Sequence, residues 1–307
     1  MSVIGIDTSN YTTSIAFFDG EVGENCSRLL PVRQGELGLR QSDAVFAHIK
    51  SLPELSDRLF SHIQKDAITA VGVSTRPRAV EGSYMPCFMV GYSHAKLLSD
   101  ALGVPLAEVS HQQGHVAASL WSAGRMDLLE KNHLAWHLSG GTTELLLVEP
   151  EGRNVKCTRI GGTTDISAGQ LIDRTGQLLE LPFPSGKHLD SLSREATGKD
   201  VFRVKCRNSE FSLSGVQNKV QQFHAASADP AETAAYALRC VAGAVYQATA
   251  QALEAYPGLS VVFSGGVASN SMLRELTATL HPVFAQPQFS TDNAMGVAVL
   301  TKRLTEE

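Results

Sequence analysis

Residues 3–18 read VIGIDTSNYTTSIAFF, an apolar run that ends in Asp7, a polar stretch, and a second apolar run. Two short apolar runs on either side of a polar turn predict a β-hairpin. Residues 134–148, LAWHLSGGTTELLLV, repeat this design, and their turn is again rich in hydroxyl groups. Two strand-turn-strand units in one chain indicate an internally duplicated α/β protein.

The segments between and after the hairpins alternate between helical and strand-like patterns. The first half predicts the order β-β-α-β-α, with a helix over residues 42–63 that Pro53 interrupts, a strand at 70–74 and a helix at 88–102. The second half predicts an irregular middle at 182–211, a strand at 259–263, and helices at 165–181, 215–224, 230–255 and 293–304. We expect the last helix to cross back and close the first lobe.

The length of the chain and its duplication predict two lobes. A single hydrophobic core usually stops growing at about 250–300 residues, and the chain has 307. We place the first lobe at residues 1–106 plus 288–307, and the second at 107–287 with a helical insertion. The layout is that of the actin/hexokinase superfamily of ATPases (ASKHA), in which a nucleotide and metal cleft lies between two RNase-H-like lobes.

The composition narrows the class of protein. With 43% hydrophobic and 19% charged residues, the chain is typical of folded globular proteins. A net charge of −5 provides no global basic field, so nucleic-acid binding would need a local patch or a partner subunit. The five cysteines are dispersed without a Cys-x-x-Cys pair, as expected of reduced thiols. The N-terminus lacks a leader pattern and no window approaches about 18 apolar residues, so we expect a soluble cytoplasmic protein.

A His-x-x-x-His pair, His111 and His115, stands at the start of a predicted helix. Four residues turn an α-helix by about 400°, so the two imidazoles project from one face, one turn apart. Zinc and ferrous iron accept such pairs, usually with a carboxylate. Asp292 is the candidate carboxylate. The spacing also occurs by accident, and Asp292 is equally suited to capping the final helix.

Two Gly-Gly turns follow predicted strands, at residues 139–143 (SGGTT) and 264–266 (SGG). Glycine lets backbone amides approach a phosphate or a base closely. Ordinary tight turns would explain each motif singly, but together with Thr8 and Ser9 they favour a nucleotide site.

These motifs, in this order, make the chain resemble the TsaD/Gcp (YgjD-like) family, the tRNA N6-adenosine threonylcarbamoyltransferases once described as O-sialoglycoprotein endopeptidases. Residues 3–9 resemble the family's first phosphate loop. Residues 109–118 resemble its H-x-E-G-H metal motif and residues 139–143 its S-G-G-H-T loop. Four further stretches match the family's patterns: 165–173, 211–215 (FSLSG), 265–270 (GGVASN) and 290–293 (STDN).

The resemblance implies a role for each matching residue. His111, His115 and Asp292 would hold one Fe²⁺ or Zn²⁺ per chain. An ATP- or AMP-type nucleotide would contact Ser139, Gly140, Gly141, Asp173, Gly186, Gly265, Gly266 and Asn270. The implied reaction is metal-assisted transfer of a threonylcarbamoyl or related carbamoyl-type group from an adenylate to adenosine in tRNA, which makes the chain an acyltransferase. The implied partners are tRNA and either a TsaB-like subunit or a second copy of the chain, and no membrane.

The first loop departs from the family, which has T-S-C-D-E-T where this chain has TSNYTT at 8–13. Both acids are absent, so the catalytic residues stay open, with Ser9, Thr12 and Thr142 as candidates. The alternative hypothesis is a catalytically weak nucleotide- and metal-binding paralogue that regulates or docks on a TsaD-type complex. Proteolysis is disfavoured, because the histidine pair lacks the adjacent glutamate of H-E-x-x-H.

A basic stretch near the predicted nucleoside turn is the candidate RNA surface. Its cationic residues are Lys187, His188, Arg194, Lys199, Arg203, Lys205 and Arg207. Lys and Arg at this density are typical of segments that follow a nucleic-acid backbone. The competing interpretation is a solvated loop.

Overall fold

The computed structural model describes residues 1–9, 11–31 and 39–306. They divide into two compact units, Met1–Lys131 with Glu149–Cys157 and Asp292–Glu307, and Asn132–Val148 with Thr158–Thr291. This division differs from the sequence-based boundary at residue 106, because β5 (Leu106–Ser110) pairs with β4 (Ile68–Arg76) and brings residues 107–131 into the first unit. No helix among the described residues is long and apolar enough to cross a membrane.

The first unit is built on a five-stranded sheet in the order β3-β2-β1-β4-β5. β1 (Ser2–Thr8), β2 (Thr12–Phe18) and β3 (Gly23–Leu29) are antiparallel, and β4 and β5 continue from β1 in parallel. The register of β1 and β2 closes at Thr8 opposite Thr13, which confirms the predicted first hairpin. β3 was not predicted.

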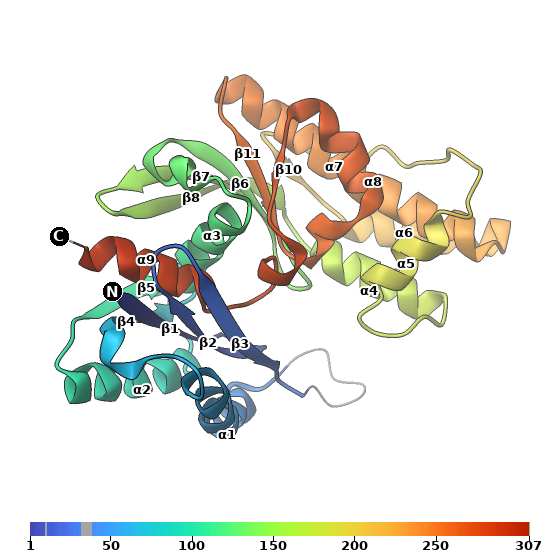
Figure 1. Ribbon diagram of the computed structural model, residues 1–307. Coiled ribbons are helices and arrows are strands. Elements are labelled where there is room, and N and C mark those ends of the chain that lie inside the picture. The colour runs from blue at the N-terminus through green and yellow to red at the C-terminus, as the bar shows by residue number, and fades with distance from the viewer. Residues whose placement is uncertain (10, 32–38, 307) are drawn as a thin grey trace. The chain divides into compact units, whose positions relative to one another are not determined.

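Helices cover both faces of this sheet (Figure 1). α1 (Gln41–Phe60) and α2 (Phe88–Leu102) pack on one face, where Ile4 and Ile6 of β1 belong to the same buried core as Leu55 of α1. α3 (His111–Ser122) and α9 (Met295–Thr305) lie on the other side, and α9 packs against β1, β2 and β4. The last helix therefore returns to the first lobe, as the sequence predicts.

The prediction that Pro53 interrupts the first helix is wrong, because α1 runs through it. Leu52 and Leu55 on either side are buried and fix the helix to the sheet. Pro53 itself is exposed. The carbonyl of Ile49, which Pro53 cannot serve, belongs to a residue that is 49% exposed, so water can satisfy it.

The second unit contains a seven-stranded sheet in the order β12-β11-β6-β7-β8-β10-β9. Its predicted hairpin is β6 (His133–Leu138) with β7 (Thr143–Glu151), antiparallel. β11 (Val261–Ser264) lies parallel to β6 on its other side. The remaining strands are β8 (Asn154–Thr163), β9 (Cys206–Arg207), β10 (Glu210–Phe211) and β12 (Val283–Phe284).

Five α-helices belong to the second unit among the described residues, and α5 packs on α4 and α7: α4 (Ala168–Leu178), α5 (Gly186–Ser193), α6 (Ser214–Ser227), α7 (Pro230–Ala255) and α8 (Ser271–Thr277). Trp136 of β6 is fully buried in the core, and its indole N–H donates to Thr249 Oγ1 of α7 at 2.8 Å. α5 lies in the segment that the sequence assigned to an irregular middle, so that prediction is wrong there.

Candidate functional site

The local sequence fixes where α3 begins. Ser110 ends β5, and its hydroxyl accepts from the backbone N–H of Gln113, while the Gln113 side chain accepts from the Ser110 N–H at 2.8 Å. This capping box makes His111 the first residue of the helix. Gln113 also donates to the carbonyl of Val155 at 2.7 Å, which ties the helix start to a neighbouring segment of the same unit. His111 and His115 therefore project one turn apart, as predicted.

Asp292 reaches the histidines from the segment just before α9. It does not cap that helix, because the N–H of Met295 is bonded to Asn293 Oδ1 at 3.0 Å. Close packing of α9 on α3 brings the segment into place. A Cβ at Gly296 would lie 1.8 Å from the carbonyl oxygen of Gly114, so only glycine permits this approach.

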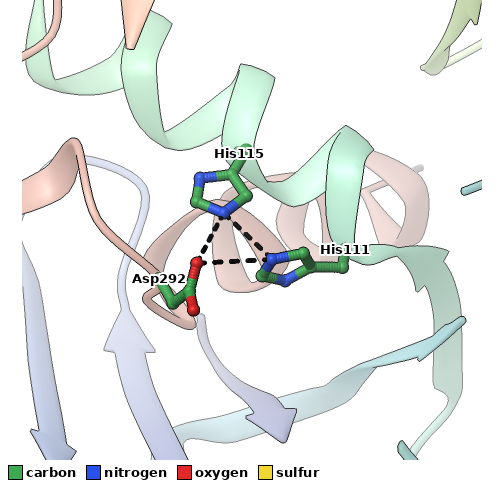
Figure 2. Close-up of side chains that lie close together, drawn as sticks. All are labelled: His111, His115 and Asp292. Atoms are coloured by element: carbon green, nitrogen blue, oxygen red, sulfur yellow. Dashed lines mark hydrogen bonds and ion pairs between the residues drawn. The ribbon is translucent and has the colours of Figure 1, made fainter. Parts of the chain in front are cut away.

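The three predicted ligand side chains point toward one another (Figure 2). The Nε2 atoms of His111 and His115 lie 3.0 Å apart. Asp292 Oδ1 lies 3.0 Å from His115 Nε2 and 3.5 Å from His111 Nε2. One ligand atom from each residue lies within 4.8 Å of the other two, all inside the first unit. Two imidazole nitrogens and a carboxylate oxygen at these separations form a donor set that suits Zn²⁺ or Fe²⁺.

The electrostatics of the cluster favour positive charge. Burial alone would lower the pKa of His111, but Asp7 and Asp292 outweigh it and raise that pKa to about 10. Burial likewise opposes the charge of Asp292, yet its bonds to His111 and His115 hold its pKa well below the usual value. The carboxylates that face the two imidazoles therefore favour positive charge at this position, as a bound cation would supply.

Sequence reasoning missed Asp7 and Ser74. Asp7 is fully buried, and its Oδ1 accepts from His111 Nδ1 at 2.9 Å and from the Ser74 hydroxyl. Burial would raise the pKa of Asp7, but these partners lower it overall. An acidic residue at the end of a buried strand was the available signal.

Of the two candidate catalytic residues in the first loop, Ser9 contacts Asp7. The backbone N–H of Ser9 donates to Asp7 Oδ2 at 3.3 Å, and the Ser9 hydroxyl is buried without a hydrogen-bond partner among the described residues. Thr12 begins β2, opposite Leu29 of β3.

The third candidate, Thr142, closes the turn of the second hairpin. Its N–H donates to the Ser139 hydroxyl at 3.1 Å, and its carbonyl accepts from the Ser139 N–H at 2.8 Å. Gly140 and Gly141 form the tip, where an added Cβ would meet no heavy atom within 4 Å. The Ser167 hydroxyl, at the start of α4, donates to the carbonyl of Gly140 at 2.6 Å. The turn is thus held by Ser139 and Ser167, while Gly140 and Gly141 stay exposed.

The two Gly-Gly turns are neighbours. Ser264 of β11 pairs with His137 of β6, so both turns follow the carboxyl ends of adjacent parallel strands. Gly265 has φ +91°, and a Cβ there would lie 2.1 Å from the carbonyl oxygen of Leu138. Gly266 faces open space. Strand ends of this kind are where open α/β sheets bind ligands.

Asp173 and Asn270 are committed to holding helices together. Asp173 Oδ1 accepts from the N–H of Ser185 at 2.9 Å, just before Gly186 begins α5. Burial outweighs this bond and raises the pKa of Asp173. Asn270 caps α8 through the N–H of Leu273 at 3.0 Å.

Asp190 of α5 is a further residue that the sequence did not indicate. Asn270 Nδ2 donates to Asp190 Oδ1 at 2.6 Å, and the N–H and hydroxyl of Ser271 donate to the same oxygen at 2.8 Å each. This carboxylate therefore joins α5 to the start of α8.

Comparison with solved structures establishes the class. HypF in its phosphate- and nucleotide-bound form aligns with a TM-score of 0.65 at 14% identity, over 100% of this chain and 47% of that one. A ROK family glucokinase from Streptomyces griseus aligns with a TM-score of 0.56 at 13% identity, over 99% and 100%. At these identities the likeness concerns the fold, and it confirms the predicted two-lobed α/β fold of the actin/hexokinase type.

Comparison with sequences then defines the family. A model described as TsaD, tRNA N6-adenosine threonylcarbamoyltransferase, matches residues 36–299. A relative of that name from Carboxydothermus hydrogenoformans is 30% identical over 314 residues, covering 96% of this chain and 90% of the relative. One from Streptococcus suis is 32% identical over 292 residues, covering 90% and 83%. The chain belongs to the TsaD family, which confirms the resemblance seen in its motifs.

Proposed function

We propose that this chain transfers a threonylcarbamoyl group to adenosine in tRNA. The observation that carries the proposal is the family match over residues 36–299. In the proposed reaction the donor is an acyl adenylate, and the N6 amine of adenosine attacks its carbonyl carbon. The new C–N bond forms, the bond to the phosphate oxygen of AMP breaks, and the proton of the amine passes to the departing phosphate or to solvent.

We further propose that His111, His115 and Asp292 hold one Fe²⁺ or Zn²⁺ ion. Support comes from the convergence of their three ligand atoms and from the positive charge that the buried Asp7 and the partly buried Asp292 favour. When bound, the ion would supply Lewis-acid stabilisation of charge that develops on the acyl carbonyl. The chain itself positions the two imidazoles through the capping box and the packing of α9 on α3.

The proposed nucleotide site uses the adjacent turns at Ser139–Gly141 and Gly265–Gly266. Their open tips leave room for a phosphate or a base against the backbone. In this arrangement Asp173 and Gly186 would contact the ribose side, and Asn270 the adenine. Because these polar side chains already hold helices, the site would be preformed rather than assembled by the ligand.

Because both family acids are absent, the first loop offers no carboxylate to accept the proton of the attacking amine. In the proposed reaction the acceptor is therefore another group. The main chains of Thr12 and Thr142 take part in strand pairing and in the turn hydrogen bond to Ser139. The Ser9 hydroxyl is buried next to Asp7 and makes no hydrogen bond among the described residues. Ser9 is therefore the proposed contact of this loop with substrate.

The partners we propose are tRNA and either a TsaB-like subunit or a second copy of the chain. All seven cationic residues from Lys187 to Arg207 are exposed, as a backbone-binding surface requires. Arg194 is less available to RNA than the other six, because its guanidinium pairs with the carboxylate of Asp190 at 3.0 Å.

Complementation tests the proposal. Cells depleted of their own TsaD should regain threonylcarbamoyladenosine in bulk tRNA, measured by mass spectrometry of nucleosides, when they express this chain. The His111→Ala/His115→Ala variant, expressed at the same level, should not restore it. Absence of the modified nucleoside with the wild-type chain and its candidate partners would overturn the transferase proposal and leave the binding-only alternative.

A further inference from the structure

Asp7 connects three segments of the first unit through one buried carboxylate. Oδ1 accepts from His111 Nδ1, at the start of α3, and from the Ser74 hydroxyl, near the end of β4. Oδ2 accepts from the backbone N–H of Ser9, in the first loop. The Asp7 side chain is 0% exposed, so water does not compete for these bonds.

The bond from His111 determines which ring nitrogen is available to a metal. An ionised carboxylate only accepts hydrogen bonds, so Nδ1 of His111 must carry the hydrogen in the 2.9 Å contact. The neutral imidazole then has its lone pair on Nε2. That atom is the one that lies 3.0 Å from His115 Nε2 and 3.5 Å from Asp292 Oδ1.

Asp7 is itself held in a fixed orientation. β1 and β4 are parallel, with Ile6 paired to Val73, so Ser74 lies on the strand next to Asp7. Ser74 is fully buried, and its hydroxyl bonds the same oxygen that His111 uses. The carboxylate therefore cannot rotate without breaking bonds to two other segments.

We propose that Asp7, supported by Ser74, is a positioning residue that sets the tautomer and direction of His111 for metal binding. The inference rests on the proposed metal site. Asp7 does not touch the ion; it acts through the ring that does. A carboxylate in this position both orients a histidine ligand and raises its basicity.

Asp7→Asn is the most direct test. Both carboxylate oxygens of Asp7 accept, whereas an asparagine offers one acceptor and places its NH₂ against either His111 Nδ1–H or the Ser9 N–H. We expect Zn²⁺ affinity, measured by competition with a chelator, to fall about 10- to 100-fold. In the Zn²⁺-loaded wild type, imidazole ¹⁵N spectra should show His111 protonated at Nδ1.

Ser74→Ala provides a milder variant in case Asp7→Asn does not fold. It removes one donor to Asp7 Oδ1 and should weaken Zn²⁺ binding several-fold. Ser14→Ala is the matched control, because the Ser14 hydroxyl is equally buried but contacts the main-chain oxygen of Asp7, at 3.4 Å, rather than the carboxylate. Its Zn²⁺ affinity should equal that of wild type.

The outcomes separate the inference from the proposal beneath it. If the wild type takes up no Zn²⁺ or Fe²⁺, the metal site fails and the inference fails with it. If the wild type binds Zn²⁺ but a folded Asp7→Asn binds it equally well, the inference alone is overturned. The same holds if Ser74→Ala and Ser14→Ala weaken binding equally, or if His111 in the Zn²⁺-loaded wild type proves to be unprotonated at Nδ1.

Discussion

The two units of the molecule use their predicted functional side chains in opposite ways. In the first unit, His111, His115 and Asp292 turn their donor atoms toward one another. In the second, Asp173 and Asn270 are occupied with the N–H of Ser185 and with α8. The difference fits the ligands that we propose for the two units. A metal centre consists of converging side chains, whereas a nucleotide bound at Gly-Gly turns relies largely on main-chain amides.

The largest expected effect tests the first unit. His111→Ala/His115→Ala should abolish metal binding, because it leaves Asp292 as a single ligand. Elemental analysis after anaerobic purification should find about one iron or zinc per wild-type chain and background in the variant. Circular dichroism should show that the variant stays folded. If the wild type contains only background metal, the proposed metal site of the first unit is wrong.

A large effect is also expected on RNA. Arg203→Glu/Lys205→Glu reverses two exposed charges, and tRNA affinity should fall on the order of 10- to 100-fold with a shallower dependence on salt. ATP binding should not change. Lys50→Glu/Lys65→Glu, an equal charge change in the first unit, is the control. If both double variants lose affinity equally, only net charge matters; if neither does, the basic stretch is not the RNA surface.

A moderate effect is expected at Asp173. Asp173→Asn keeps an oxygen for the Ser185 N–H but loses the charge and one acceptor, so AMP or ATP affinity should fall roughly tenfold, on the order of 1–3 kcal/mol. Asp173→Ala should lose the same affinity and some stability as well. Calorimetry and thermal unfolding separate the two. Equal nucleotide affinity in all three proteins would show that Asp173 serves the fold alone.

Asn270 should affect stability directly. Asn270→Ala removes the cap of α8 and the bond to Asp190, and the free energy of unfolding should fall by about 1–2 kcal/mol. Asn270→Ser keeps a capping oxygen and should lose less. Denaturant titration without nucleotide measures both. A stability equal to wild type in Asn270→Ala would mean that these bonds are not what joins α5 to α8.

The smallest effect concerns pH. The pKa of Asp173 is raised in the folded protein, so its contribution to stability is present below the unfolded pKa of about 3.9 and is lost as pH rises through the folded value. Asp173→Asn lacks this dependence. Its stability relative to wild type should therefore increase between about pH 4 and neutrality. A constant difference across that range would contradict the raised pKa.

Local patterns in the sequence predict much of the fold. Both hairpins, the helix that begins at Phe88 and the helix that begins at Pro230 appear where short-range periodicity and turn residues place them. β3 and α5 were missed. β3 alternates weakly and is half exposed, and α5 follows a proline-rich segment that reads as a loop. The prediction at Pro53 was wrong because Leu52 and Leu55 hold the helix to the sheet, and a helix fixed in this way tolerates an exposed proline.

The candidate site shows the same contrast between residues that a local pattern reveals and residues that only long-range packing brings together. His111 and His115 share one helical face, so their spacing alone predicts that they converge. Asp292 was a candidate carboxylate that suited capping equally well, because no local pattern links it to His115, 177 residues away. Asp7 and Asp190 were not found, since their roles depend on which strands and helices become neighbours, and no local pattern encodes that.

Asp7 also has a consequence for cooperativity. One of its oxygens accepts from His111, a proposed metal ligand, and the other accepts from the backbone of the first loop. A ligand that shifts the Ser9 N–H thus changes the acceptor that orients His111. By thermodynamic reciprocity, the factor by which loop occupancy changes metal affinity equals the factor by which the metal changes affinity at the loop. A single buried carboxylate is enough to make the two binding events report on each other.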